Sequence, residues 1–229
     1  MLIFLDVETT GLEDKDKICS IGLIALKGDE VLSMYELVNE GKKISSKASS
    51  VNHITNEMIK GKPKFIDTKI FEFLQKYNNS NTTIVGHNIN FDISKLSVCG
   101  FDYKGGIIDT LRVTKHLIKE CDGYALQYLR YELKLYKKES GEITPHNALS
   151  DAFIVKSLYE YLLDIATYEK MCDLTFENVL IEKFKYGKYA NRYIEEISTY
   201  DRGYLEWMLS SATDLDEDLR YSINYYLNP

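Results

Sequence analysis

Proline, low-complexity sequence and long apolar runs are all scarce in this chain. Its 229 residues include 3 Pro and no repetitive tract. No apolar run approaches the roughly 18 residues of a membrane-spanning helix, which excludes that class. The N-terminal apolar run has no basic segment before it and is too short for a signal peptide. Because 45% of the residues are hydrophobic and 28% are charged, we expect a globular, cytoplasmic protein.

Cysteine is also infrequent, and its spacing excludes two kinds of site. The 4 Cys are Cys19, Cys99, Cys121 and Cys172, and no two of them form a C-x-x-C pair. Such scattered residues do not form a disulfide framework or a zinc site. We expect free thiols in a reducing compartment.

Positive charge is in short supply, with 28 Lys and Arg against 35 Asp and Glu and a net charge of −7. This balance argues against a nucleic-acid-binding protein unless the bases gather in one place. They gather in residues 180–192, where four bases and one acid give a local charge of +3. Two divalent cations on acidic residues would also bring −7 to −3. The position of the bases is therefore more informative than the total.

Hydrophobic patterning predicts an α/β fold. Apolar or β-branched runs predict strands at residues 2–5, 18–26, 30–38, 82–85 and 107–108. Helical tendency or spacing appears at residues 45–62, 65–77, 111–119, 125–135 and 147–165, and a further helix begins near Asn90. Three strands followed by alternating helices and strands indicate a mixed five-stranded sheet flanked by helices. Functional sites in such sheets lie at strand ends.

The first predicted strand is followed by two acids, Asp6 and Glu8. Residues two apart point to the same face of a strand, so the two carboxylates lie side by side. Two such charges about 4 Å apart repel by about 4 kcal/mol at an effective dielectric constant near 20. A cation or a proton must relieve this repulsion, and oxygen ligands favour Mg²⁺ or Mn²⁺. An acid-x-acid pattern arises by chance about five times in so acidic a chain, so the pair alone does not establish a site.

Two further segments place an acid near the start of a helix. Asp92 follows the strand at 82–85 and falls in the first turn of the next helix, where an acid also complements the helix dipole. Asn147 suits the N-cap of the helix at 147–165. Asp151 then lies early in that helix, and His146 lies on the loop before it. Taken alone, a histidine such as His146 is more often a loop residue that faces solvent.

Together these residues form an ordered pattern of Asp6-x-Glu8, His87-Asn-x-x-Phe-Asp92 and His146-x-x-x-x-Asp151. This pattern resembles the DEDDh (DnaQ-like) 3′–5′ exonucleases, which have a ribonuclease H-like fold. Asp6, Glu8, Asp92 and Asp151 match the four acids of that family, and His146 matches its catalytic histidine.

The resemblance covers residues 1–166. It extends to the segments at 6–12 and 109–110, and to Ile54-Thr55 followed by Pro63. One position departs from the family, because Asn52 stands where a histidine is usual.

The resemblance implies two-metal phosphodiester hydrolysis with two Mg²⁺ ions, for which Mn²⁺ can substitute. Asp6 would bridge both ions, Glu8 and Asp151 would hold one, and Asp92 would hold the other. His146 would take the proton from the attacking water, so activity should rise with pH in the neutral range where an imidazole titrates. Expected substrate contacts are the backbone of Thr9 and Thr10, the apolar side chain of Leu12, and Asn88.

The C-terminal region has a different pattern, with residues 167–180 as a connector and residues 181–229 as a small α+β accessory domain. Its basic segment interleaves charge with aromatic rings, which suits phosphate binding and base stacking. The expected nucleic-acid contacts there are Lys183, Lys185, Tyr186, Lys188, Tyr189 and Arg192. Alternatively, the aromatic residues form the core of this domain and the lysines its solvated face. The order of motifs resembles the C-terminal extension of the exodeoxyribonuclease X type of this family.

The favoured function is a metal-dependent 3′–5′ exodeoxyribonuclease that acts on DNA 3′ ends in repair, with no membrane partner. One alternative is a proofreading subunit of a polymerase. It is less favoured because clamp-binding tethers usually begin with Gln, and the only two, Gln75 and Gln127, lie in predicted helices. A 3′–5′ exoribonuclease is another, since these motifs do not read the 2′-hydroxyl. A catalytically silent module that binds nucleic-acid ends is the third, although all five catalytic side chains are present. Oligomeric state and strand preference are left open.

Overall fold

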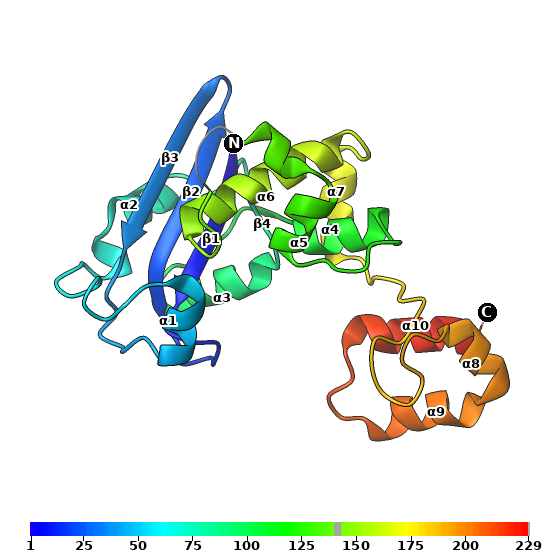
Figure 1. Cartoon of the computed structure of the whole chain (residues 1–229). Coiled ribbons are helices and arrows are strands. Elements are labelled where there is room, and N and C mark those ends of the chain that lie inside the picture. The colour runs from blue at the N-terminus through cyan, green and yellow to red at the C-terminus, as the bar shows by residue number, and fades with distance from the viewer. Residues whose placement is uncertain (140–142, 229) are drawn as a thin grey trace. The chain divides into compact units, whose positions relative to one another are not determined.

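The computed structural model describes residues 1–139 and 143–228, and the chain divides into two compact units. The first unit is Met1–Thr175 and contains the sheet, and the second is Phe176–Pro229 (Figure 1). Each unit has a hydrophobic core of its own.

A mixed five-stranded sheet forms the centre of the first unit, as predicted. Its strands are β1 (Leu2–Thr9), β2 (Ile18–Lys27), β3 (Glu30–Leu37), β4 (Thr83–Gly86) and β5 (Gly106–Asp109). They are ordered β3-β2-β1-β4-β5. The first three form antiparallel pairs, and β4 and β5 add in parallel beside β1. Strand β2, which lies between β3 and β1, reads as a nearly continuous apolar run because helices cover both faces of the sheet.

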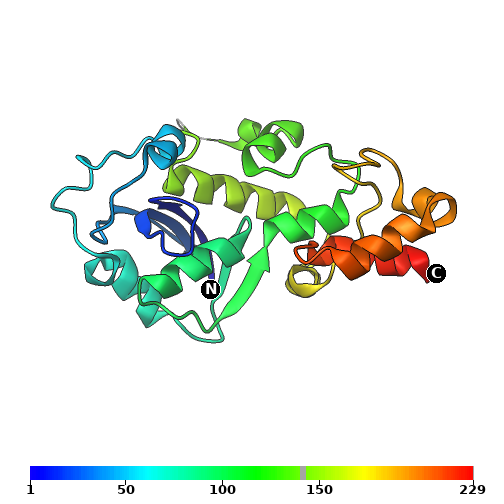
Figure 2. The same ribbon diagram turned by 90° about the horizontal axis from the view of Figure 1, so that it is seen from below.

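Two sets of helices cover the two faces of this sheet. Those of the first unit are α1 (Ser46–Asn52), α2 (Lys69–Lys76), α3 (Ile89–Val98), α4 (Thr110–Leu117), α5 (Leu126–Glu132), α6 (Ala148–Leu163) and α7 (Tyr168–Phe176), with the 3-10 helices η1 (Phe65–Asp67) and η2 (Leu135–Lys138). Side chains alternate across β1, so Ile3 and Leu5 pack with α2 and α3 on one face. Phe4 packs on the other face with α4 to α7. Figure 2 shows α6 lying along that second face.

A glycine in β2 allows α6 to lie unusually close to the sheet. Gly22 pairs with Asp6 across the β1–β2 ladder. A Cβ atom at Gly22 would overlap the backbone nitrogen of Leu149, in the first turn of α6. Because glycine has no Cβ, this turn can lie directly over the ladder, beside the acidic end of β1.

The first unit extends past residue 166, through part of the segment expected as a connector. Met171 and Leu174 of α7 are buried in the same cluster as Phe4. The hydroxyl of Thr175 accepts a 2.9 Å hydrogen bond from the backbone N–H of Asp109. The apolar stripe of α7 is too short to stand out in the sequence, which explains the difference in boundary.

The second unit is helical rather than α+β. It contains α8 (Ile194–Tyr200), α9 (Arg202–Ser211) and α10 (Glu217–Leu227) around a small core of its own. In place of a sheet, the described part of this unit has one isolated antiparallel bridge, between Lys183 and Tyr193. Gly187 and Asn191 have positive φ angles of 84° and 66°, which turn the segment between these residues into a loop. The expectation of β structure here was wrong for that reason.

The cysteines and the lengths of the helices bear on two classes that the sequence argued against, disulfide frameworks and membrane spans. All 4 Cys are free thiols, as expected. Within residues 1–139 and 143–228, no helix combines the length and apolar character needed to cross a membrane.

Candidate active site

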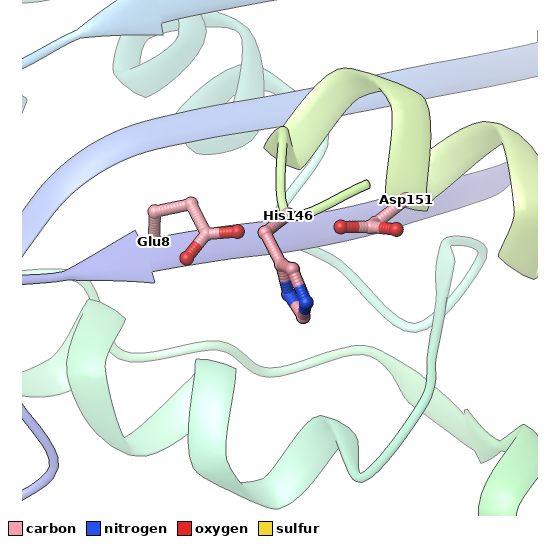
Figure 3. Close-up of side chains that lie close together, drawn as sticks. All are labelled: Glu8, His146 and Asp151. Carbon is pink, nitrogen blue, oxygen red and sulfur yellow. The ribbon is translucent and has the colours of Figure 1, made fainter. Parts of the chain in front are cut away.

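Three of the predicted catalytic side chains meet at the acidic end of β1. Potential ligand atoms of Glu8, His146 and Asp151 all lie within 4.8 Å of one another. Glu8 comes from β1, Asp151 comes from the first turn of α6, and His146 lies on the loop that enters α6 (Figure 3). The five-residue offset between His146 and Asp151 therefore brings both to one point, since one is on the loop and the other on the helix.

Asp92 joins this group from the other side of β1. Its Oδ1 accepts a buried 3.0 Å hydrogen bond from the backbone N–H of Val7, between the two acids of the strand. This bond fixes the first turn of α3 against β1. Asn88 makes the tight turn before α3 with a φ angle of 65°, and its own N–H donates to Asp109 at 2.9 Å. The predicted contact of Asn88 with substrate is not tested by these observations.

Burial raises the proton affinity of all four carboxylates, and neighbouring acids of the site raise that of Asp6 and Glu8 further. Burial raises the pKa of Glu8 to about 8, and repulsion from Asp151 and Asp92 adds to the effect. Burial raises the pKa of Asp92 to about 8 and that of Asp151 to about 6. The pKa of Asp6 is raised well above its ordinary value by burial and by the three neighbouring acids.

This donor set fits divalent cations. Four clustered carboxylates supply oxygen ligands only, the type that Mg²⁺ and Mn²⁺ prefer. Their charged forms are destabilised by burial and mutual repulsion, and a dication between them would reverse both effects. Asp6, Glu8, Asp92 and Asp151 are the residues that would hold it.

His146 is exposed and has a left-handed backbone, with a φ angle of 57°. Its backbone N–H donates to the carboxylate of Asp151, and this bond lowers the pKa of that acid. The loop backbone therefore steadies the acid while the imidazole stays accessible to solvent. This arrangement suits a group that exchanges protons with water.

A hollow of about 450 Å³ lies beside Glu8. Two stretches of the chain line it, which are residues 8–13 with Lys15 and Asp16, and residues 42–52, represented by Lys42, Lys43, Ser45, Lys47, Ala48, Val51 and Asn52. Leu12 lines this hollow with 77% of its surface exposed, and its apolar contact with substrate stays a prediction. The backbone of Thr10 is already engaged, because its N–H donates to Lys17 and its C=O accepts from Ser45. The buried side chains of Thr9 and Thr10 bond within the same loop.

Asn52, at the position where the family usually has histidine, is buried against the site. Its amide donates to the backbone oxygen of Thr9 at 3.2 Å, and its Oδ1 accepts from the N–H of Ile54 at 3.0 Å. A hydrogen bond from Asn52 to Glu8 partly offsets the raised pKa of that acid. The substitution thus keeps a hydrogen-bond donor next to Glu8.

The side chains of the second unit that were predicted to contact nucleic acid differ in how strongly they are bound within the protein. Lys188 and Tyr189 both bind Asp201, at 2.9 and 2.6 Å, and Tyr189 packs against the core. Arg192 forms two hydrogen bonds to Glu196. The Nζ atom of Lys183 lies 4.4 Å from the ring centre of Tyr193.

Tyr186 has 71% of its surface exposed, whereas Phe184 is buried in the core of this unit. Lys185 also has an interaction partner within the chain. The aromatic residues of this segment are therefore divided between the core and the surface. One sequence-based interpretation had assigned all of them to the surface, and the other had assigned all of them to the core.

Two residues of the site were missed from the sequence. Gly22 admits α6, and a glycine within a strand pattern is a signal of close backbone approach. Gln127 of α5 donates a 2.7 Å hydrogen bond from Nε2 to Oδ1 of Asp151. It belongs to no motif, so no sequence signal pointed to it.

Known proteins are similar to this chain in sequence and in fold. The family model of the exonuclease family RNase_T matches residues 3–159. Exodeoxyribonuclease 10 of Escherichia coli (strain K12) is 28% identical over 230 residues, which cover 99% of this chain and 99% of that protein. A PolC-type DNA polymerase III of Thermotoga maritima is 34% identical over 164 residues, which cover 69% of this chain and 11% of the polymerase. The solved structure of exonuclease X in complex with 5′ overhanging duplex DNA superposes with a TM-score of 0.62 and 26% identity, covering 76% of this chain and 99% of that one.

Proposed function

Because the chain belongs to the exonuclease family RNase_T, we propose that it is a Mg²⁺-dependent 3′–5′ exodeoxyribonuclease that releases mononucleotides from DNA 3′ ends. The observation that carries the proposal is the convergence of Glu8, His146 and Asp151 beside a hollow that is large enough for a nucleotide. The match to an exodeoxyribonuclease over nearly the whole of both chains supports DNA as the substrate.

The family depends on divalent metal ions, and we propose Mg²⁺ as the physiological one, with Mn²⁺ as a substitute. When bound, two such ions supply Lewis-acid stabilisation of the charge that develops on the phosphate. Asp6, Glu8, Asp92 and Asp151 would hold these ions.

The remaining residues bind substrate and move the proton. A water oxygen attacks phosphorus while an imidazole nitrogen of His146 accepts the proton of that water. The bond from phosphorus to the 3′ oxygen breaks, the 3′ oxygen leaves with the electron pair, and it takes a proton from solvent to become the new 3′-hydroxyl. Leu12 packs against the terminal base, and the loop that contains Thr9 and Thr10 positions the nucleotide that carries this base. Burial of these carboxylates strengthens their attraction for a divalent cation.

Coverage favours a stand-alone enzyme over a polymerase subunit. The chain covers 99% of an exodeoxyribonuclease and 11% of the polymerase that contains a related segment. A catalytically silent module fits less well, because all five side chains of the catalytic set are present. A role in DNA repair and a cytoplasmic location stay predictions.

We also propose that the second unit helps to hold DNA. The basic charge of residues 180–192 and the exposed ring of Tyr186 support this role. One stacked base is worth about 1–3 kcal/mol, so Tyr186→Ala should weaken DNA binding by roughly 5-fold or more. Fluorescence anisotropy with a labelled oligonucleotide would measure this change. Unchanged affinity would assign Tyr186 to the protein surface alone.

The test of the main proposal uses 5′-labelled substrates: single-stranded DNA, duplex DNA with blunt or recessed ends, and single-stranded RNA. Each is incubated with Mg²⁺ or Mn²⁺, with Asp6→Ala as the inactive control. We expect a one-nucleotide ladder from the 3′ end of DNA that is absent in the variant. A ladder on RNA alone would move the assignment to RNA trimming. Binding without cleavage in either metal would leave the silent module as the better description.

A further inference from the structure

Asp151 is held by a side chain from a helix that carries none of the catalytic residues. Gln127 lies on α5, and its Nε2 atom donates to Oδ1 of Asp151 at 2.7 Å. The backbone N–H of His146 also donates to this carboxylate. Two donors from different segments therefore restrain the same acid.

The amide of Gln127 is itself fixed in orientation. Its Oε1 accepts a hydrogen bond from Nη1 of Arg130 at 3.3 Å. A guanidinium has donors only, and an ionised carboxylate has acceptors only. The oxygen of the amide must therefore face Arg130, and its nitrogen must face Asp151.

Arg130 is anchored in turn by Glu139. Its Nε and Nη2 atoms donate to the two carboxylate oxygens of Glu139, at 2.7 and 2.6 Å. Each of these two side chains is only 9% exposed, so the pair is shielded from solvent and geometrically defined. Leu126 and Leu129 also pack α5 into the same core cluster as α6. The donor group of Gln127 thus has a rigid base.

We propose that Gln127 is a positioning residue that holds the carboxylate of Asp151 toward Glu8 and His146 and keeps its second oxygen available to a divalent cation. The inference rests on the proposed metal-dependent function. Four like charges at one point push one another apart, and a carboxylate on a free χ1 angle would rotate away from the group. The hydrogen bond from Gln127 opposes this rotation before any cation arrives, so less ordering remains to be done when one binds.

The decisive variant is Gln127→Met, which keeps the length of the side chain and removes its polar atoms. Gln75→Met is the matched control, because Gln75 is the other glutamine of the chain and is exposed on α2. Mn²⁺ affinity is measured by calorimetry on the full chain without nucleic acid. Thermal stability is measured in EDTA, and kcat and KM are measured on single-stranded DNA.

We expect Gln127→Met to lower Mn²⁺ affinity by about 10-fold, the usual effect of losing a partner that orients a ligand. The value of kcat should fall at limiting Mn²⁺ and recover as Mn²⁺ is raised, with KM for DNA unchanged. Arg130→Met should show the same pattern more weakly, because the amide of Gln127 remains but loses its anchor.

Unchanged Mn²⁺ affinity in Gln127→Met would overturn the proposal. If KM for DNA were also higher, Gln127 would be a substrate contact. If thermal stability in EDTA were lower instead, Gln127 would be a packing residue. A wild-type chain that binds Mn²⁺ but degrades no DNA would overturn the proposed function instead, and the calorimetric comparison would still test the role of Gln127.

Discussion

The acids of this site are placed where their own charge is unfavourable, which makes their proton affinity informative. Burial and mutual repulsion raise the pKa of Glu8 to about 8 in the metal-free protein, against an ordinary value near 4.5. The folded state therefore holds this proton more tightly than the unfolded state does. Its contribution to stability is full below about pH 4.5 and is lost as the pH rises toward 8.

Glu8→Gln should remove this pH-dependent loss. In EDTA at pH 8, the variant is expected to melt about 2–4 °C above the wild type, which corresponds to about 1 kcal/mol in a chain of this size. Below pH 4.5 the two melting temperatures should converge. Scanning calorimetry from pH 4 to 8 measures the difference. The control is Glu72→Gln, because Glu72 is an exposed residue of α2. Parallel melting curves for Glu8→Gln and wild type across this range would contradict the assignment.

His146 can be tested separately from the acids. Its left-handed backbone suits asparagine, so His146→Asn should fold normally. We expect the rate to fall by about 10² to 10⁴ and the rise in activity through neutral pH to disappear. The rate is measured as single-turnover cleavage from pH 5.5 to 8.5. His53→Asn is the control, because His53 is also exposed and left-handed. Full activity in His146→Asn would remove the role of general base.

At the scale of elements, the site depends on how closely α6 approaches the sheet. Gly22→Ala would push a methyl group into the backbone of the first turn of α6. Such overpacking costs about 1–3 kcal/mol, and the displaced turn carries Asp151 away from Glu8. We therefore expect Gly22→Ala to have a lower melting temperature and to lose more exonuclease activity than the comparison variant, Gly203→Ala.

The comparison for Gly22→Ala is Gly203→Ala, in helix α9, where nothing lies within 4 Å of the added atom. That change should be neutral or stabilising by up to about 1 kcal/mol. Thermal melting and cleavage rates of both variants measure the contrast. Wild-type activity in Gly22→Ala would show that α6 can shift without harm to the site.

The sequence predicted these elements unevenly, for physical reasons. Strands β1 and β2 and the long helix α6 have strong apolar patterns, and the acids follow strand ends in a recognisable order. Met171 and Leu174 form too short a stripe to reveal α7 as part of the core. The contact between Gln127 and Asp151 depends on how α5 packs against α6, and nothing in the sequence near Gln127 records that packing.

For the molecule as a whole, the boundary between the two units has a measurable consequence. A chain ending at residue 178 keeps all of α7, whereas a chain ending at 166 loses Met171, Leu174 and the hydroxyl of Thr175. Losing one buried Met or Leu side chain costs about 2–5 kcal/mol. We expect the longer chain to unfold cooperatively and to cleave short single-stranded DNA, and the shorter one to aggregate or melt far lower. Circular dichroism melting of both chains is the measurement. Equal melting temperatures would place the boundary at 166.

The second unit was the part least accessible from sequence. Alternating bases and aromatic residues fitted either a binding surface or a core, and the structure divides them: Phe184 and Tyr189 contribute to the core while Tyr186 faces solvent. Lys188 and Arg192 are paired with acids that lie later in the chain. Composition reports the charge of a segment, whereas the partners of each charge depend on tertiary structure.

The assembly of the site from distant segments has a consequence for biosynthesis. Asp6 and Glu8 leave the ribosome well before Asp151, which follows only after all five strands of the sheet have been made. Since α6 brings Asp151 and also much of the core cluster that covers one face of the sheet, a nascent chain lacks both until this helix docks. Nuclease activity thus arises only once α6 has docked, and a nascent polypeptide that ends before this helix has no means of cutting nucleic acid.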